Sequence, residues 1–212
     1  DLGERRRDAT LTDAAAMAVA VHAAEPMAGL PVLDAAALAA LPTAGLASLA
    51  ALRERGRWAG TDDIHDSLSA LEAVAKQRTD GAEAAPFGLC HSEFHPTSIH
   101  IGAAGTHVLD FARAFTGPGL LDLASWPGTI EPPDPAGLRQ LLTVYVAAGG
   151  PVEVFADRGG LPAERWAYGM HRLWVVAWYL AQQTTWIDDE TEDPTYQQVV
   201  RRHLGEAAQC LT

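Results

Sequence analysis

Ionisable and polar side chains are concentrated between positions 91 and 98, and a further carboxylate follows about a dozen residues later. The residues that could do chemistry are His91, Glu93, His95, Ser98 and Asp110. Imidazole and carboxylate groups move protons in catalysis, and carboxylate and hydroxyl oxygens are ligands for hard cations such as Mg²⁺. The spacing places four of these groups in one loop and the fifth after an apolar run. We interpret the segment as a candidate site that handles protons and a metal ion.

A transition-metal site is an alternative interpretation of the same segment. His91, Glu93 and His95 alternate along the chain, so on an extended backbone they would share one face and could bind zinc. Pro96 interrupts the extended segment, and no fourth ligand stands at a typical spacing. A small metal-dependent hydrolase built on these three side chains stays open as an alternative.

The elements that must position this segment are mostly helical by pattern. Short strands are expected at 87–90 and 99–101 and a better one at 106–111, with a turn at 102–105 joining the last two into a hairpin. Helices are expected at 14–24 after a Thr12 cap, 30–52 (one or two short helices broken by Pro31 and Pro42), 62–78, 137–148, 162–183 and 195–210. The sequence therefore predicts one domain over residues 1–212, of α+β class, mostly α-helical, with a small β-hairpin at the site.

The residues of the loop form a recognisable sequence motif. Residues 91–98 read His-Ser-Glu-Phe-His-Pro-Thr-Ser, and residues 109–111 read Leu-Asp-Phe. This motif resembles the His-Gly-Asp-Phe-His-Pro-x-Asn and Ile-Asp-Phe motifs of aminoglycoside phosphotransferase-like kinases, most strongly over 91–124. The resemblance implies a protein-kinase-like C-terminal lobe. It also implies transfer of phosphate from ATP or GTP, with Mg²⁺, to a hydroxyl of an acceptor. That acceptor would be a small molecule, either an aminoglycoside-like antibiotic or another metabolite, or a modified peptide.

The resemblance also implies a role for each residue of the loop. Glu93 stands where the family has its catalytic aspartate, and His91 would brace the loop beside it. Ser98 stands where the family has a metal-binding asparagine, and Asp110 matches the second metal ligand. His95, with the proline that follows it, would shape the turn at the cofactor site.

Three loop positions differ chemically from the family pattern. Glu93 is one methylene longer than aspartate, and Ser98 offers a hydroxyl instead of an amide carbonyl, which is a weaker ligand for Mg²⁺. Ser92 replaces a glycine, so a positive φ there would carry strain. Asp122 matches the aspartate of the family's Asp-Leu-Ala helix start, and we expect it to bind backbone donors and support the loop.

The C-terminal region supplies candidates for an acceptor site. One helical pattern carries the aromatic side chains Trp166, Tyr168, His171, Trp174, Trp178 and Tyr179, and the acidic run 186–193 follows. In the family that the chain resembles, this part faces the acceptor, and carboxylates there would suit a cationic compound. Two alternatives stay open: aromatic residues at helical spacing are typical of a core, and an acidic run is typical of a solvated loop.

Composition limits the class of protein. The 212 residues carry a net charge of −12, which argues against nucleic acid or an anionic membrane as a partner. We expect no apolar run to reach the roughly 20 residues that span a bilayer. Cys90 and Cys210 stand far apart, so no disulfide framework is expected. The first residue is Asp1, which suggests a fragment, and we expect a cytoplasmic protein.

A nucleotide-covering lobe is not recognisable in these residues. They contain no Gly-x-Gly-x-x-Gly, and the single lysine, Lys76, lies in a helical pattern and not in a strand. We therefore expect the N-terminal lobe to be absent from this chain, either because a longer protein carries it or because there is none. In the second case the chain would be a catalytically impaired pseudokinase lobe that acts as a binding or scaffold module.

Overall fold

The structure is a computed structural model that describes residues 4–187 and 189–212. Helices dominate, and the strands form two small antiparallel sheets, so the predicted α+β, mostly helical class is confirmed. The main elements in chain order are α1 (Leu11–His22), α2 (Ala35–Glu54), α3 (Asp62–Gln77), β1 (Phe87–Cys90), β2 (Ile99–Gly102), β3 (Gly105–Val108), β4 (Phe115–Pro118), α4 (Leu120–Ser125), α5 (Pro135–Ala147), α6 (Ala163–Thr185) and α7 (Asp193–Leu211). Short 3₁₀ helices lie between them, at Pro96–Ser98, Val152–Phe155 and Glu190–Glu192.

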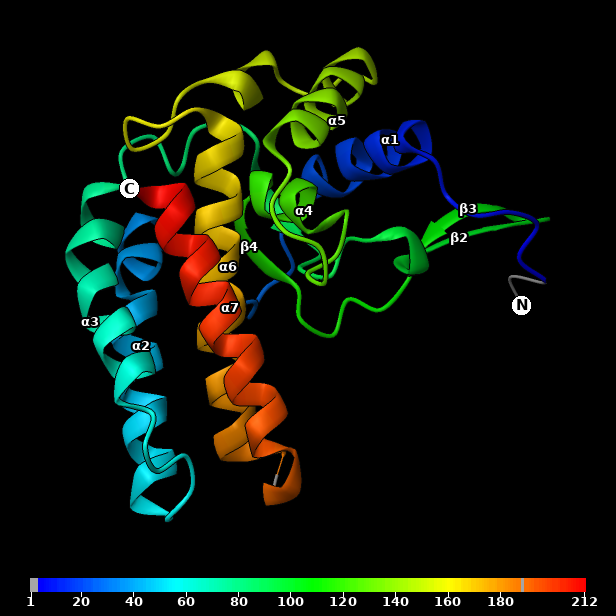
Figure 1. Cartoon of the computed structure of the whole chain (residues 1–212). Coiled ribbons are helices and arrows are strands. Elements are labelled where there is room, and N and C mark those ends of the chain that lie inside the picture. The colour runs from blue at the N-terminus through cyan, green and yellow to red at the C-terminus, as the bar shows by residue number, and fades with distance from the viewer. Residues whose placement is uncertain (1–3, 188) are drawn as a thin grey trace.

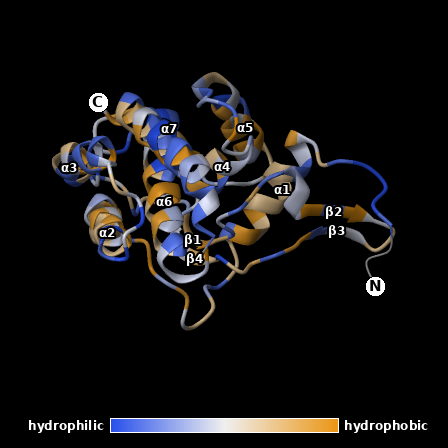
Figure 2. Cartoon of the chain, turned by 60° about the horizontal axis from the view of Figure 1, so that its bottom comes forward, coloured by the Kyte–Doolittle hydropathy of each residue, from blue (hydrophilic) through white to orange (hydrophobic). Residues whose placement is uncertain are grey.

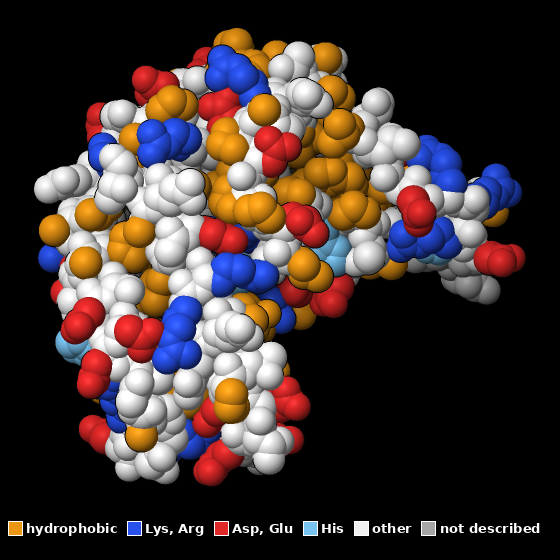
Figure 3. All heavy atoms as spheres, in the orientation of Figure 1, with side chains coloured by type: hydrophobic (Ala, Val, Ile, Leu, Met, Phe, Trp, Pro, Cys, Tyr) orange, Lys and Arg blue, Asp and Glu red, His pale blue; other side chains and the backbone are white. Residues whose placement is uncertain are grey.

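Two groups of helices flank the strands. Helices α2, α3, α6 and α7 lie side by side, and α1, α4 and α5 form a second group beside the upper part of α6 (Figure 1). The β2–β3 hairpin projects from the second group, as Figure 2 shows from another side. Hydrophobic side chains gather over α4 and α5 on the face shown in Figure 3, whereas charges of both signs are scattered over the long helices. Helix α6 contacts both groups and is therefore the central element of the fold.

The two sheets connect the parts of the candidate site. Strand β1 pairs with β4 in a register that places Cys90 opposite Phe115, and β2 pairs with β3 across the expected turn. Strand β4 was not predicted, because its Phe-Thr-Gly-Pro sequence lacks the alternation that marks a strand. Strand β3 ends at Val108, earlier than predicted, because Asp110 has φ of 69° and extended structure cannot continue through that conformation.

Two helix predictions were wrong in detail. The N-cap of α1 is Thr10 and not Thr12: its hydroxyl accepts a hydrogen bond from the backbone of Asp13, whose carboxylate accepts the Thr10 backbone N–H in return. The region 30–52 holds one helix, α2, which continues through Pro42. A proline inside a helix costs about 3 kcal/mol, and burial of α2 against α3 and α6 offsets this cost.

Helix α2 also corrects an expectation about apolar runs. Its 20 residues have a mean hydropathy of 1.8, which by length and composition alone is enough to cross a membrane. Core helices of soluble proteins meet the same criterion. One side of α2 packs against α3 and α6 and buries Leu38, Leu49 and Leu52, so packing within the protein accounts for the 33% of the apolar stretch that is buried.

Candidate active site

Asp122 holds the loop that follows β1. Its carboxylate accepts the backbone N–H groups of His91 at 2.6 Å and of Ser92 at 2.7 Å, and the side chain is fully buried. Behind it, Nε2 of His22 lies 3.5 Å from the carboxylate, and the Tyr145 hydroxyl lies 3.0 Å from Nδ1 of the same ring. The expected role of Asp122 as a support for the loop agrees with this geometry.

His91 joins the loop to the end of the hairpin. Its Nε2 donates a hydrogen bond to the carbonyl of Leu109 at 2.7 Å, and its Nδ1 accepts the backbone N–H of Glu93 at 3.3 Å. The His91 ring also packs edge-on against Phe111, with 4.7 Å between centroids. The contacts at Leu109 and Phe111 fix the backbone on both sides of Asp110, so His91 holds Asp110 beside the loop.

The other two predicted cofactor-binding residues, Ser98 and His95, lie in the same loop. The Ser98 hydroxyl donates to the carbonyl of Glu93 at 2.7 Å, and the Ser98 carbonyl accepts the Leu109 N–H at 2.9 Å. Nδ1 of His95 lies 2.6 Å from the hydroxyl of Thr97, and partial burial lowers the pKa of His95. The structure therefore brings together His91, Glu93, His95 and Ser98, with Asp110 at their edge.

Asp110 is available for a ligand. It is exposed, and the contact found for its carboxylate is a long hydrogen bond of 3.4 Å from the backbone of Ala112. The Ser98 hydroxyl oxygen keeps lone pairs while it donates to Glu93. Oxygen donors of this kind suit Mg²⁺, so the residues present fit the expected ion.

Ser92 is strained, as its replacement of a glycine suggested. Its φ is 78°, and its buried hydroxyl has no hydrogen-bond partner. Left-handed backbone costs a non-glycine residue about 1–2 kcal/mol, and a buried unpaired hydroxyl adds to the cost.

We predict that Ser92→Gly stabilises the protein by about 1 kcal/mol, because relief of both costs exceeds the extra chain entropy of glycine in the unfolded state. Urea unfolding would measure the change. Ser67→Gly, at an exposed position inside α3, is the matched control and should lose about 0.5 kcal/mol. Destabilisation by Ser92→Gly would contradict the strain argument.

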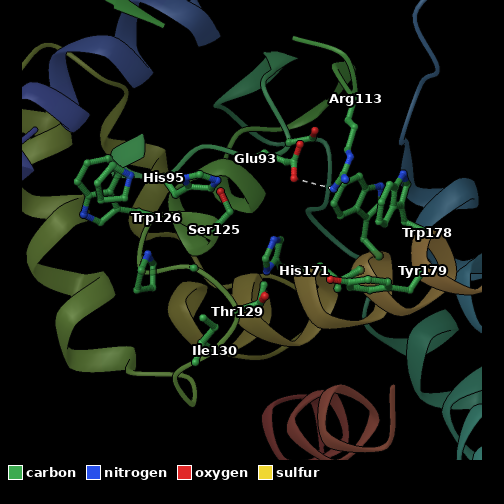
Figure 4. Close-up of a pocket in the computed structure, with 16 residues that line it drawn as sticks. Glu93, His95, Arg113, Ser125, Trp126, Thr129, Ile130, His171, Trp178 and Tyr179 are labelled. Carbon is green, nitrogen blue, oxygen red and sulfur yellow. Dashed lines mark ion pairs between the residues drawn. The ribbon is translucent and has the colours of Figure 1, made fainter. Parts of the chain in front are cut away.

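Glu93 forms an ion pair with an arginine that no sequence pattern marked as a site residue. Its carboxylate lies 2.7 Å from a guanidinium nitrogen of Arg113, and both side chains are about one-third exposed. The Arg113 guanidinium carbon also lies 3.4 Å from the ring centroid of Trp178 on α6. Figure 4 shows the three side chains in this order, with the ion pair dashed. Arg113 thus links the candidate catalytic carboxylate to the aromatic face of α6.

A pocket of about 490 Å³ opens beside Glu93. Its walls are the loop after β1, the segment 126–130 that follows α4, and one face of α6 (Figure 4). A cavity of this size next to a few convergent polar groups is the usual form of a small-molecule site.

The aromatic residues of α6 divide between the core and the pocket. Trp166 and Tyr168 are buried in the core, whereas Trp174, Trp178 and Tyr179 line the pocket. None of the described residues of the acidic run lines the pocket. Asp193 pairs with Arg57, the other described residues of the run are exposed or partly exposed, and Asp188 lies outside the described residues. The core interpretation therefore holds for Trp166 and Tyr168, and an acceptor role for the three residues at the pocket stays a prediction.

The zinc alternative finds no support in the geometry. Within residues 4–187 and 189–212, the ligand atoms of His91, Glu93 and His95 do not form a cluster; those of His22, Cys90 and Asp122 do, within 4.8 Å. In that cluster the Asp122 carboxylate already binds loop amides, and burial raises the pKa of the Cys90 thiol well above its ordinary value. A protonated thiol is a poor metal ligand, so this cluster supports the loop.

The fold and the site define a mostly helical protein in which a polar loop faces a pocket of small-molecule size. The sequence model of the phosphotransferase enzyme family, APH, matches residues 1–154, which is more than half of the chain. The chain therefore belongs to this family. The matched part contains the loop and Asp110 but not α6. No curated protein matches the chain.

Proposed function

We propose that this chain is the C-terminal, acceptor-binding lobe of a protein-kinase-like phosphotransferase that uses ATP or GTP. The family supports a phosphotransferase in the general sense. The observation that carries the finer proposal is the position of Glu93. Its carboxylate lines the 490 Å³ pocket, on a loop whose other contacts fix the backbone around Asp110.

In the proposed reaction, a hydroxyl of an acceptor in the pocket attacks the γ-phosphorus of the nucleotide. The new oxygen–phosphorus bond forms as the bond to the β–γ bridging oxygen breaks, and the nucleoside diphosphate leaves. Glu93 orients the hydroxyl and takes its proton. Asp110 and Ser98 would hold Mg²⁺, which neutralises charge on the phosphates. His91 and Asp122 keep the loop in place, because misplacement by about 1 Å costs roughly 100-fold in rate.

The test is phosphate transfer by the full-length protein with any upstream sequence in place. Mg²⁺-ATP and Mg²⁺-GTP would be supplied with a panel of hydroxy compounds, and phosphorus NMR would follow the products. We expect acceptor-dependent release of nucleoside diphosphate, and we expect Glu93→Gln to lower turnover by at least about 100-fold with nucleotide affinity retained. Turnover unchanged in Glu93→Gln would remove Glu93 from the mechanism.

A pseudokinase lobe is the second candidate, and one observation favours it. The Glu93 carboxylate is already paired with the Arg113 guanidinium at 2.7 Å, so an acceptor hydroxyl would have to compete with this charge-assisted contact for the carboxylate oxygens. Absence of a metal-dependent thermal shift with either nucleotide would favour a binding module over an enzyme.

A further inference from the structure

The pocket contains a cation site that the protein fills with its own side chain. An indole face beside a carboxylate binds ammonium and guanidinium groups, since both attract positive charge. In this pocket Trp178 offers the face and Glu93 the carboxylate, and the guanidinium of Arg113 contacts both, at 3.4 Å from the ring centroid and 2.7 Å from the carboxylate oxygen. A cationic ligand would have to displace Arg113 and break both contacts.

The rest of the pocket wall offers little to a cation. Glu93 is the one carboxylate among the described residues that line it. Trp126, Ile130, Trp174 and Val175 supply an apolar surface. His171 lines the pocket as a neutral ring, because burial lowers its pKa to about 3.

We infer that the acceptor is an uncharged, mainly apolar hydroxy compound with an aromatic or similarly flat part, and that Arg113 is the specificity residue that excludes cations. This inference rests on the proposed function, since it names the acceptor of the same site. The apolar part lies against α6 and the segment 126–130, and the hydroxyl reaches Glu93. Because the APH match ends at residue 154, it does not include α6, and the family does not determine the part of the pocket wall that α6 forms.

The inference replaces the cationic acceptor that the acidic run suggested. A polyamine-like compound needs several carboxylates to offset the cost of removing its charges from water. The described lining provides one, already paired with Arg113. An apolar compound gains about 25 cal/mol for each Å² that it buries, and the indole rings of α6 give it a surface to bury.

The experiment measures binding to the full-length protein by calorimetry, without nucleotide. The probes are 2-naphthyl β-D-glucopyranoside, methyl β-D-glucopyranoside and kanamycin, which separate an aromatic group, a sugar alone and a polycation. We expect the naphthyl glucoside to bind at least tenfold more tightly than either of the others. Kanamycin binding as tightly as the naphthyl glucoside would overturn the inference. A naphthyl glucoside that binds no better than the methyl glucoside would also overturn it.

Substitutions test which residues determine the affinity for the probes. Trp174→Leu should weaken naphthyl glucoside binding at least tenfold, because Arg113 does not cover this indole. Trp186→Leu, the matched control at a site 77% exposed and outside the pocket lining, should leave it unchanged. Arg113→Gln should raise kanamycin affinity at least fivefold, because it frees Glu93 and the Trp178 face. Ile130→Ser, at a lining position 81% exposed, provides a second test if Trp174→Leu does not fold, and should weaken naphthyl glucoside binding. Equal affinities in all these variants would contradict the inference.

Failure of this inference is distinguishable from failure of the proposed function. Tight binding of the naphthyl glucoside with no phosphate transfer from either nucleotide leaves the acceptor class standing and removes the phosphotransferase. Phosphate transfer to kanamycin in preference to the naphthyl glucoside keeps the phosphotransferase and removes the uncharged acceptor.

Discussion

Asp122→Ala is expected to lower the free energy of unfolding by about 3–5 kcal/mol, the largest effect on stability that we predict. The buried carboxylate binds the backbone N–H groups of His91 and Ser92. Alanine would leave both amides buried and unpaired, at about 1–3 kcal/mol each, and would remove the neighbour of His22. Urea unfolding followed by tryptophan fluorescence measures the loss.

Further measurements connect this loss of stability to the loop. Asp122→Asn retains one acceptor oxygen and should lose about half as much, so it keeps the test open if the alanine variant does not fold. Asp66→Ala, which removes a carboxylate 81% exposed, is the matched control and should cost less than about 1 kcal/mol. Amide hydrogen exchange at His91 and Ser92 should accelerate in Asp122→Asn. Unchanged exchange there would mean that Asp122 does not hold the loop.

The parts of the fold that follow from local periodicity were predictable from the sequence. Helices α3, α5, α6 and α7 repeat apolar residues at three- and four-residue spacing, and the glycines at the turn between β2 and β3 mark the hairpin. Strand β4 was missed because its pairing with β1 is a long-range interaction that leaves no alternating pattern. Helix α2 was divided at Pro42 because local propensity predicts a break there, and tertiary packing overrides it.

Some residues of the candidate site were likewise predictable from the sequence, and others were not. The motif of the loop identified Glu93 and Asp110 as candidates. The replacement of a glycine by Ser92 predicted the positive φ of that residue. Arg113 and His22 were missed, because their partners are distant in sequence or lie across the pocket. One signal was available for Arg113: a cation three residues after Asp110, in a segment otherwise short of basic residues, suggests a nearby carboxylate.

Asp110→Asn is expected to abolish most metal-dependent nucleotide binding, the largest effect on ligand affinity that we predict. Asparagine tolerates the left-handed backbone that Asp110 adopts, whereas alanine would add about 1 kcal/mol of strain at φ of 69°. The Asp110 side chain is exposed and has one long contact, so Asp110→Asn should change stability by less than about 0.5 kcal/mol. Loss of the charged ligand should weaken binding of Mg²⁺-ATP or Mg²⁺-GTP by about 100-fold.

A thermal-shift titration of the full-length protein separates the two effects. At 100 times its dissociation constant, a nucleotide stabilises the folded state by about 2.7 kcal/mol, and a 100-fold weaker ligand at the same concentration gives only about 0.4 kcal/mol. Asp66→Asn, on the exposed side of α3, should keep the full shift. If Asp110→Asn retains the shift, Asp110 is not the metal ligand. The bound ion must then be held elsewhere in the protein, because Ser98 alone offers a neutral hydroxyl that already donates to Glu93.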